Sequence, residues 1–164
     1  MPISTHVKQL RAKVGTDLLL LPGVSAIIVN HAGEILLQRR SDFGTWALIG
    51  GILDPGEEPA DAVVREVFEE TAVEVEPVRI TGVYCTPLVR YPNGDEASYV
   101  ITTFLCRPVG GPGPRVNDDE SLDVRYFHPQ NLPELRPDHR LRIEHALSNS
   151  DRAYFVRKNK STHE

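Results

Sequence analysis

Three glutamates lie close together near the end of one short segment, at a spacing that suits an α-helix. Glu66, Glu69 and Glu70 are related as i, i+3 and i+4, and residues at these spacings are neighbours on a helix surface. We expect a helix over residues 59–71, because Pro59 suits the first helical position. The three carboxylates would then lie within an arc of about 100°.

This cluster is electrostatically unfavourable when no cation is bound. Like charges at i and i+4 destabilise a helix by roughly 0.2–0.5 kcal/mol per pair. Carboxylates in the last turn also face the negative end of the helix dipole, at about 0.3–1 kcal/mol each. Arg65, four residues before Glu69, relieves only part of this cost. A divalent cation such as Mg²⁺, which prefers carboxylate oxygens, would reverse each contribution. The alternative is a solvated acidic helix face, which is common.

The segment from Gly51 to Val73 resembles the Nudix box, Gly-x5-Glu-x7-Arg-Glu-U-x-Glu-Glu-x-Gly-U, where U is a bulky apolar residue. The box covers 23 of the 164 residues, and eight of its nine restricted positions match. Such a pattern is far more specific than a lone glycine motif. The exception is Ala72, which stands where the family has glycine. A residue just after a helix often has a positive φ, so we expect strain at Ala72.

The flanks of the box are also similar to the Nudix family. Residues 33–40, Trp46 and the Gly50-Gly51 pair resemble the usual lead-in, and the segments 91–95 and 118–127 resemble a bacterial subgroup. With these flanks, the resemblance extends from about Val7 to Leu147.

The resemblance implies a metal site on the helix. Glu66, Glu69 and Glu70 would bind Mg²⁺, with Mn²⁺ as a substitute, and the carbonyl of Gly50 would be a further ligand. Glu66 and Glu69 would also count as catalytic residues. The implied reaction is an attack of water on one phosphorus of a diphosphate.

Three other residues of the box have supporting roles by resemblance. Arg65 would orient the glutamates, and Glu57 would pair with Arg65 to hold the preceding loop on the helix. Gly51 is a structural residue of the motif. The alternative for Glu57 and Arg65 is an ordinary surface ion pair.

Outside the box, Glu120 is the candidate for an extra metal ligand or general base. It lies in a loop before a strand, as such residues do in relatives, and Asp95 and Glu96 are its rivals on another loop. Acids on loops are usually solvated, which is the alternative for all three.

Four residues are candidates for substrate binding. Arg39 and Arg40 lie at the end of a strand that leads to the site, and only one of them can face it because side chains alternate along a strand. Arginine binds phosphate oxygens well. Trp46 and Tyr91 could stack on a base, although an aromatic residue near a sheet is more often part of the core.

The remaining chain predicts one α/β (α+β) domain over residues 1–164 with a mixed sheet. The resemblance implies the Nudix fold, an α/β/α sandwich around a central mixed β-sheet.

On helix 59–71, a core stripe is expected at Ala60, Val64, Val67, Phe68 and Thr71, opposite the glutamates. The other expected elements are a helix at about 3–14, a strand over 17–30 broken at Pro22-Gly23, a second strand over 34–40 that forms a hairpin with it, a turn at 91–95, strands over 73–85, 97–107 and 122–127, a loop over 108–114, a helix over 138–149 and a flexible tail over about 157–164.

Composition narrows the partners. The net charge is −5, which argues against a general nucleic-acid or membrane surface. No apolar run is long enough to span a bilayer. Cys85 and Cys106 form no metal or disulfide pattern, which favours reduced thiols and a cytoplasmic location. The N-terminal helix could support a homodimer, as in many relatives.

The favoured function is therefore a Mg²⁺-dependent pyrophosphohydrolase acting on a small-molecule nucleoside diphosphate derivative. Both a nucleotide sugar such as ADP-ribose and a nucleoside triphosphate remain candidate substrates. The alternative is a non-catalytic Nudix domain that acts as a nucleotide sensor or interaction module. The third hypothesis is a generic acidic α/β domain, which predicts no stabilisation by Mg²⁺.

Overall fold

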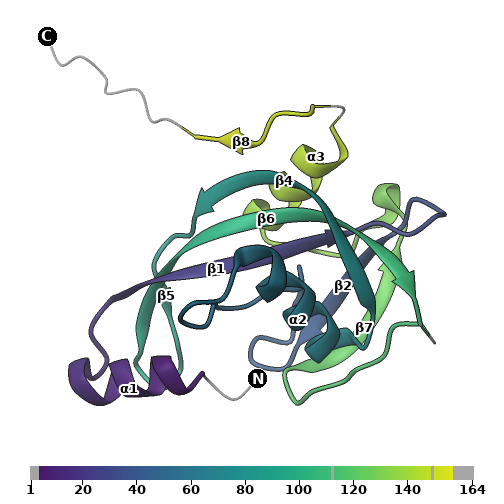
Figure 1. Ribbon diagram of the computed structural model, residues 1–164. Coiled ribbons are helices and arrows are strands. Elements are labelled where there is room, and N and C mark those ends of the chain that lie inside the picture. The colour runs from purple at the N-terminus through teal and green to yellow at the C-terminus, as the bar shows by residue number, and fades with distance from the viewer. Residues whose placement is uncertain (1–3, 112, 149, 157–164) are drawn as a thin grey trace, which may run out of the picture.

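Two β-sheets and three α-helices make up the computed structural model, which describes residues 4–111, 113–148 and 150–156 (Figure 1). In chain order the elements are α1 (Thr5–Val14), β1 (Leu19–Ile28), β2 (Ile35–Arg40), β3 (Trp46–Ala47), α2 (Pro59–Thr71), β4 (Glu74–Cys85), β5 (Val89–Arg90), β6 (Glu96–Gly110), β7 (Ser121–Phe127), a 3₁₀ turn (Pro129–Asn131), α3 (Pro137–Leu147) and β8 (Tyr154–Phe155).

The larger sheet has the strand order β1-β6-β4-β8, with β5 paired to β6. Strands β1 and β6 are parallel, whereas β4 and β6 are antiparallel. The smaller sheet has the order β3-β2-β7 and is antiparallel. The mixed α+β architecture predicted from the sequence is confirmed.

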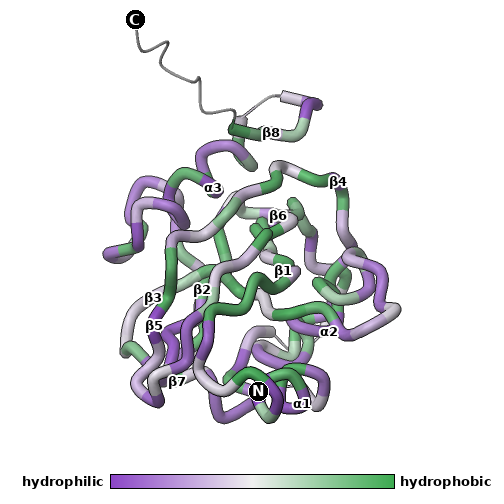
Figure 2. The backbone as a smooth tube through the Cα atoms, turned by 90° about the vertical axis from the view of Figure 1, so that its left-hand side faces the viewer, coloured by the Kyte–Doolittle hydropathy of each residue, from purple (hydrophilic) through white to green (hydrophobic). Residues whose placement is uncertain are grey.

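Helices α2 and α3 pack on opposite sides of the larger sheet. Val63 and Val67 of α2 share one core cluster with Val24 of β1 and with Leu36 of β2. Ile143 of α3 belongs to a second cluster, with Ile27 and Leu37. Alternate residues of β1 and β2 therefore serve the two helices, as the period-2 geometry of a strand requires. In Figure 2 the hydrophobic stretches of β1 lie in the middle of the molecule.

The predicted break at Pro22-Gly23 is wrong, because β1 runs through both residues. The carbonyl of Pro22 accepts a hydrogen bond from the amide of Leu53, at 3.3 Å. In a strand, the nitrogen and carbonyl of one residue point to the same side. The missing N–H of Pro22 therefore faces the loop beside β1 and costs no bond to β6, which fits the known preference of proline for strand edges.

The predicted hairpin between the second and first strands is also wrong. The turn at His31–Gly33 forms, but only Val29 and Ile35 make a bridge between the two segments. Strand β2 instead pairs with β3 and β7 in the smaller sheet. The two strands diverge after the turn, and α2 packs against residues of both.

Other boundaries differ by a few residues. Strand β6 continues to Gly110, into the predicted loop, and α3 begins at Pro137. The short strand β8 was not predicted. Helix α1 begins at Thr5 after the N-cap Ser4, and the predicted tail over 157–164 lies outside the described residues. Within the described part of the chain, no helix is long and apolar enough to cross a membrane.

Candidate metal and active site

Helix α2 has the predicted bounds, and Val67 and Thr71 of the predicted core stripe are buried, but the centre of the buried face is turned toward the glutamates. Glu66 and Glu70 are 0% and 1% exposed, whereas Phe68 of the predicted core stripe is 46% exposed, and Ala60 is also exposed. At 100° per residue, Glu70 lies close to the middle of the buried arc. The prediction that the glutamates lie opposite the core is wrong for Glu66 and Glu70, because α2 contacts both sheets and its buried face is wide enough to include two carboxylates.

The Gly50-Gly51 pair lets the preceding loop approach these carboxylates. A Cβ atom on Gly51 would lie 2.3 Å from Cδ of Glu66, and one on Gly50 would lie 2.2 Å from the carbonyl oxygen of Val24. The amide of Gly50 points at Oε2 of Glu70, at 3.3 Å. Only glycine fits at either position.

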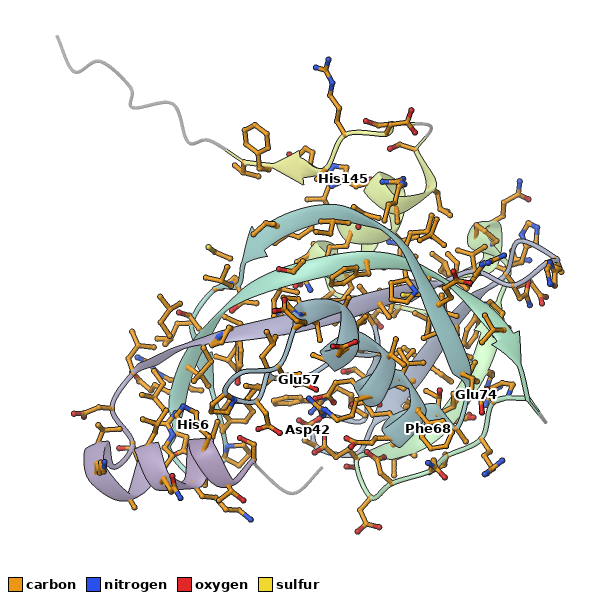
Figure 3. All side chains as sticks on the ribbon, in the orientation of Figure 1. His6, Asp42, Glu57, Phe68, Glu74 and His145 are labelled. Carbon is orange, nitrogen blue, oxygen red and sulfur yellow. The ribbon has the colours of Figure 1, made fainter. Side chains whose placement is uncertain are left out.

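Arg65 joins the loop to the helix as predicted. Its guanidinium donates to both carboxylate oxygens of Glu57, at 2.7 and 2.8 Å. It also donates to Glu66 at 2.9 Å and to Glu69 at 3.3 Å. These hydrogen bonds lower the pKa of Glu57. The bidentate geometry fixes Arg65, which in turn orients Glu66. Figure 3 labels Glu57 in the loop beside α2.

Burial governs the charge state of the two enclosed glutamates. Desolvation raises the pKa of Glu66 to about 7, although Arg65 opposes the shift. Desolvation, followed by the nearby charge of Glu66, raises the pKa of Glu70 to about 8. Oε2 of Glu66 and Oε1 of Glu70 are buried and have no hydrogen-bond partner among the described residues. Such oxygens fit a divalent cation, which would supply the missing partner.

The loop before β7 brings two more acids to Glu70. One carboxylate oxygen each of Glu70, Asp118 and Glu120 lies within 4.8 Å of the other two. The structure therefore supports the placement predicted for Glu120. The loop is held to the end of α2 because the side-chain amide of Asn117 donates to the carbonyl of Phe68, at 3.0 Å.

Sequence reasoning missed Asp118 and Gln38. The acidic run 118–120 was visible, but the path of the loop decides which of its members face the helix. Gln38 is 0% exposed and donates to Oε2 of Glu70 at 2.7 Å. The feature of the sequence that could have pointed to Gln38 is a single amide side chain directly after the apolar run Ile35–Leu37.

The other predicted acids lie elsewhere. The carboxylate of Glu69 is 43% exposed and contacts Arg65, and it is not in the group formed by Glu70 and the loop acids. Asp95 pairs with Arg11 at 3.5 Å, and Glu96 pairs with Arg90 at 2.7 Å.

Of the two candidate arginines, only Arg40 lies beside the acids. Its guanidinium is hydrogen-bonded to Asp42 and lies 3.7 Å from Oε2 of Glu120. Its positive charge also opposes the rise in the pKa of Glu70. Arg39 instead donates to the carbonyl of Gly44, at 3.0 Å. Arg39 and Arg40 therefore point to different places, and Arg40 is the one beside Glu120.

The two candidate aromatic residues, Trp46 and Tyr91, also lie in different places. Trp46 is opposite Arg39 in the sheet and packs edge-on against Phe127, with ring centroids 4.8 Å apart. The structure does not bring it near the acids. Tyr91 shares a 2.7 Å hydrogen bond with the hydroxyl of Tyr99, and both rings lie close enough to Arg40 to interact with its charge.

Comparison with known proteins gives a consistent assignment. Residues 19–147 match the family model of the NUDIX domain. The chain is 36% identical over 111 residues to a MutT-like protein of Streptomyces ambofaciens, covering 68% of this chain and 66% of that protein. It is 34% identical over 128 residues to the NAD-capped RNA hydrolase NudC of Pseudomonas putida, covering 73% of this chain and 42% of that protein. The chain thus spans less than two thirds of these relatives.

Solved structures agree on the fold. An ADP-ribose pyrophosphatase from Streptococcus suis superposes with a TM-score of 0.62 at 26% identity, covering 82% of this chain and 96% of that chain. A MutT protein from Methanosarcina mazei Go1 gives a TM-score of 0.62 at 25% identity, covering 79% and 94%.

Proposed function

Since the chain belongs to the Nudix family of hydrolases, we propose that it is a Mg²⁺-dependent pyrophosphohydrolase that cleaves a nucleoside diphosphate linked to another group. One observation carries the proposal. The Nudix helix buries Glu66 and Glu70, each with one oxygen that has no hydrogen-bond partner among the residues that the structure describes, and Asp118 and Glu120 converge on Glu70. A buried acidic cluster of this kind is costly for the fold and useful for binding a cation.

The residues that would hold Mg²⁺, or Mn²⁺ in its place, are Glu66, Glu69 and Glu70 with the carbonyl of Gly50. When bound, the metal polarises the phosphoryl group and lowers the pKa of the attacking water. Glu66 and Glu70 bring buried acceptor oxygens to this site. The more exposed Glu69 would complete the ligand set at the solvent side.

Four further side chains have roles in this proposal. Arg65, fixed by Glu57, holds Glu66 and Glu69 in place. Glu120 accepts the proton of the attacking water or adds a ligand, because its carboxylate reaches the oxygens of the cluster. Arg40 contacts phosphate oxygens from beside Glu120.

Substrate binding outside the diphosphate rests mainly on Tyr91, which interacts electrostatically with Arg40. Arg39 and Trp46 were predicted in the same role, but their positions lend it no support.

A nucleotide sugar such as ADP-ribose and a nucleoside triphosphate are both retained as candidate substrates. The likeness to an ADP-ribose pyrophosphatase supports the nucleotide sugar. A cytoplasmic location and a homodimer stay predictions.

The test is hydrolysis of a nucleotide panel with and without Mg²⁺, with identification of the products. We expect turnover only with the metal, and a loss of more than about 100-fold in Glu70→Gln, because even residues that merely support a metal ligand contribute 10–100-fold. The matched control is Glu74→Gln, an exposed glutamate four residues further along, which should change turnover by less than about twofold. The nucleotide product separates the two substrate classes.

Two outcomes would contradict the proposal. Tight nucleotide binding without any turnover would favour the sensor function. If Mg²⁺ changes neither nucleotide binding nor the melting temperature, the buried glutamates do not bind the metal and the Mg²⁺-dependent reaction is refuted.

A further inference from the structure

We propose that Gln38 is a positioning residue for Glu70: its amide holds one carboxylate oxygen so that the other is presented to the acidic cluster. This inference rests on the proposed function, because it assigns the arrangement of the metal site to a residue outside the Nudix box. Gln38 lies on β2, which enters the site from the smaller sheet.

Both ends of the Gln38 amide are used, and both contacts are buried. Nε2 donates to Oε2 of Glu70 at 2.7 Å, and Oε1 accepts from the hydroxyl of Ser121 at 2.6 Å. Gln38 is 0% exposed and Ser121 is 6% exposed. A carboxylate that binds a cation is ionised and only accepts hydrogen bonds, so the donor end of the amide must face Glu70 in the metal-bound state.

These contacts leave the two oxygens of Glu70 unequal. Oε2 receives Gln38 and, at a longer 3.3 Å, the amide of Gly50. Oε1 is buried and has no hydrogen-bond partner in the described part of the chain. Gln38 therefore makes the short contact that decides which oxygen remains for a cation.

The same amide connects the helix acid to the loop acids. The backbone amides of Glu120 and Ser121 donate to Oδ1 of Asp118, at 3.0 and 3.2 Å. The hydroxyl of Ser121 then donates to Gln38, which donates to Glu70. This chain of hydrogen bonds runs from the loop through β2 to α2. Gln38 thus sets the position of Glu70 relative to Asp118 and Glu120.

A neutral amide suits this task. A lysine or arginine at position 38 would bring a full positive charge to Glu70 and compete with the cation, whereas the amide donates a hydrogen bond without net charge. Supporting residues that donate to metal ligands in this way typically contribute 10–100-fold to metal affinity.

The test measures Mn²⁺ binding directly, by the electron paramagnetic resonance signal of free Mn²⁺, on the full chain without nucleotide. Gln38→Met keeps the volume but removes both contacts, and we expect roughly 10–100-fold weaker binding. Ser121→Ala should weaken binding less, and the double variant should bind no more weakly than Gln38→Met, because Ser121 acts through Gln38. The matched control is Thr81→Val, which removes a buried strand hydroxyl far from the acids and should bind Mn²⁺ as the wild type does.

Wild-type Mn²⁺ affinity in Gln38→Met would overturn the inference, and additive losses in the double variant would do the same. If Gln38→Met does not fold, Ser121→Ala decides: affinity below that of Thr81→Val supports the inference, and equal affinity overturns it. A wild-type chain that binds no Mn²⁺ or hydrolyses no nucleotide would refute the proposed function itself. A wild type that does both, beside an unaffected Gln38→Met, would refute only the role of Gln38.

Discussion

Helices α2 and α3 both bury charge against the larger sheet, but they compensate it differently. On α2, Glu66 and Glu70 lie one turn apart with like charge, and each has a buried oxygen without a hydrogen-bond partner among the described residues. The Nε of Arg142 on α3 also lacks a partner among these residues, so the difference lies in the charges that surround each group. On α3, Arg142 is 4% exposed and donates to Asp138, one turn earlier on the same helix, at 3.2 Å. Its guanidinium also lies 5.3 Å from the centre of the Tyr84 ring.

The difference separates a structural charge from a functional one. Arg142 has an opposite charge and an aromatic face within the fold, and its Tyr84 neighbour continues into a stack with His145. In Figure 3 His145 lies at the end of the molecule opposite Asp42 and Glu57. Glu70 is instead surrounded mainly by like charges, which natural proteins retain where a ligand restores the balance.

The comparison predicts that removing the α3 charge harms stability alone. Arg142→Met should lower the free energy of unfolding by about 1–3 kcal/mol, because it removes the cation from the Tyr84 ring and one of the two arginines that pair with Asp138, the other being Arg136. The melting temperature should fall by roughly 2–4 °C per kcal/mol, while Mn²⁺ affinity is unchanged. Arg140→Met, an exposed position on the same helix, is the control for stability. Weaker Mn²⁺ binding in Arg142→Met would break the separation between the two regions.

The pH dependence of stability should have opposite signs in the two regions. In α2, burial raises the pKa values of Glu66 to about 7 and Glu70 to about 8. The folded state therefore holds protons that the unfolded state has released, and stability falls as the pH rises from about 4.5 to 8. In α3, burial lowers the pKa of His139 to about 4. Stability there rises as the pH rises from about 4 to 6.5 and is then constant.

The two effects oppose each other below pH 6.5, so the window from pH 6.5 to 8 isolates α2. We expect the metal-free protein to lose about 1–2 kcal/mol across it, or roughly 2–8 °C in melting temperature. Glu70→Gln should flatten the profile, and Mg²⁺ should stabilise the wild type more at pH 8 than at pH 6.5. An equal fall in Glu70→Gln would show that Glu70 is not the cause.

Local rules predicted the parts of the site that depend on neighbours in sequence. Proline at the first helical position and the spacing of the glutamates predicted the bounds of α2, and the resemblance to the Nudix box implied the pair between Glu57 and Arg65. These features need only one helix and its preceding loop. The sign of φ at Ala72 was likewise predictable, because it follows from how helices end.

The features that depend on distant strands could not be predicted from one sequence. The burial of Glu70 requires knowing that two sheets enclose α2, and the contact with Gln38 joins residues 32 positions apart. The hairpin failed for the same reason, since β2 finds its partners in β3 and β7. Period-2 and period-3.6 patterns indicate which face is apolar, but they do not say which elements meet.

The smallest predicted effect concerns how the two helices end. Ser148, the residue that follows α3, has an extended backbone, whereas Ala72, the residue that follows α2, has φ 56° and ψ 19°. Ala72 is the only residue other than glycine with a positive φ among the described residues. A left-handed alanine costs roughly 1–2 kcal/mol, and glycine there would remove this strain but return about 0.4–1 kcal/mol of chain entropy to the unfolded state.

Ala72→Gly should therefore stabilise the metal-free protein by at most about 1.6 kcal/mol, which raises the melting temperature by no more than roughly 6 °C. Ser148→Gly should give no gain, because the extended backbone there favours no glycine. Mn²⁺ affinity in Ala72→Gly decides what the strain does. If affinity is unchanged, the cost at the end of α2 is confined to the backbone, and the electrostatic imbalance around Glu70 alone distinguishes the two helices. If affinity falls, the left-handed alanine helps to hold Glu70, two residues before it, in the geometry that the cation needs.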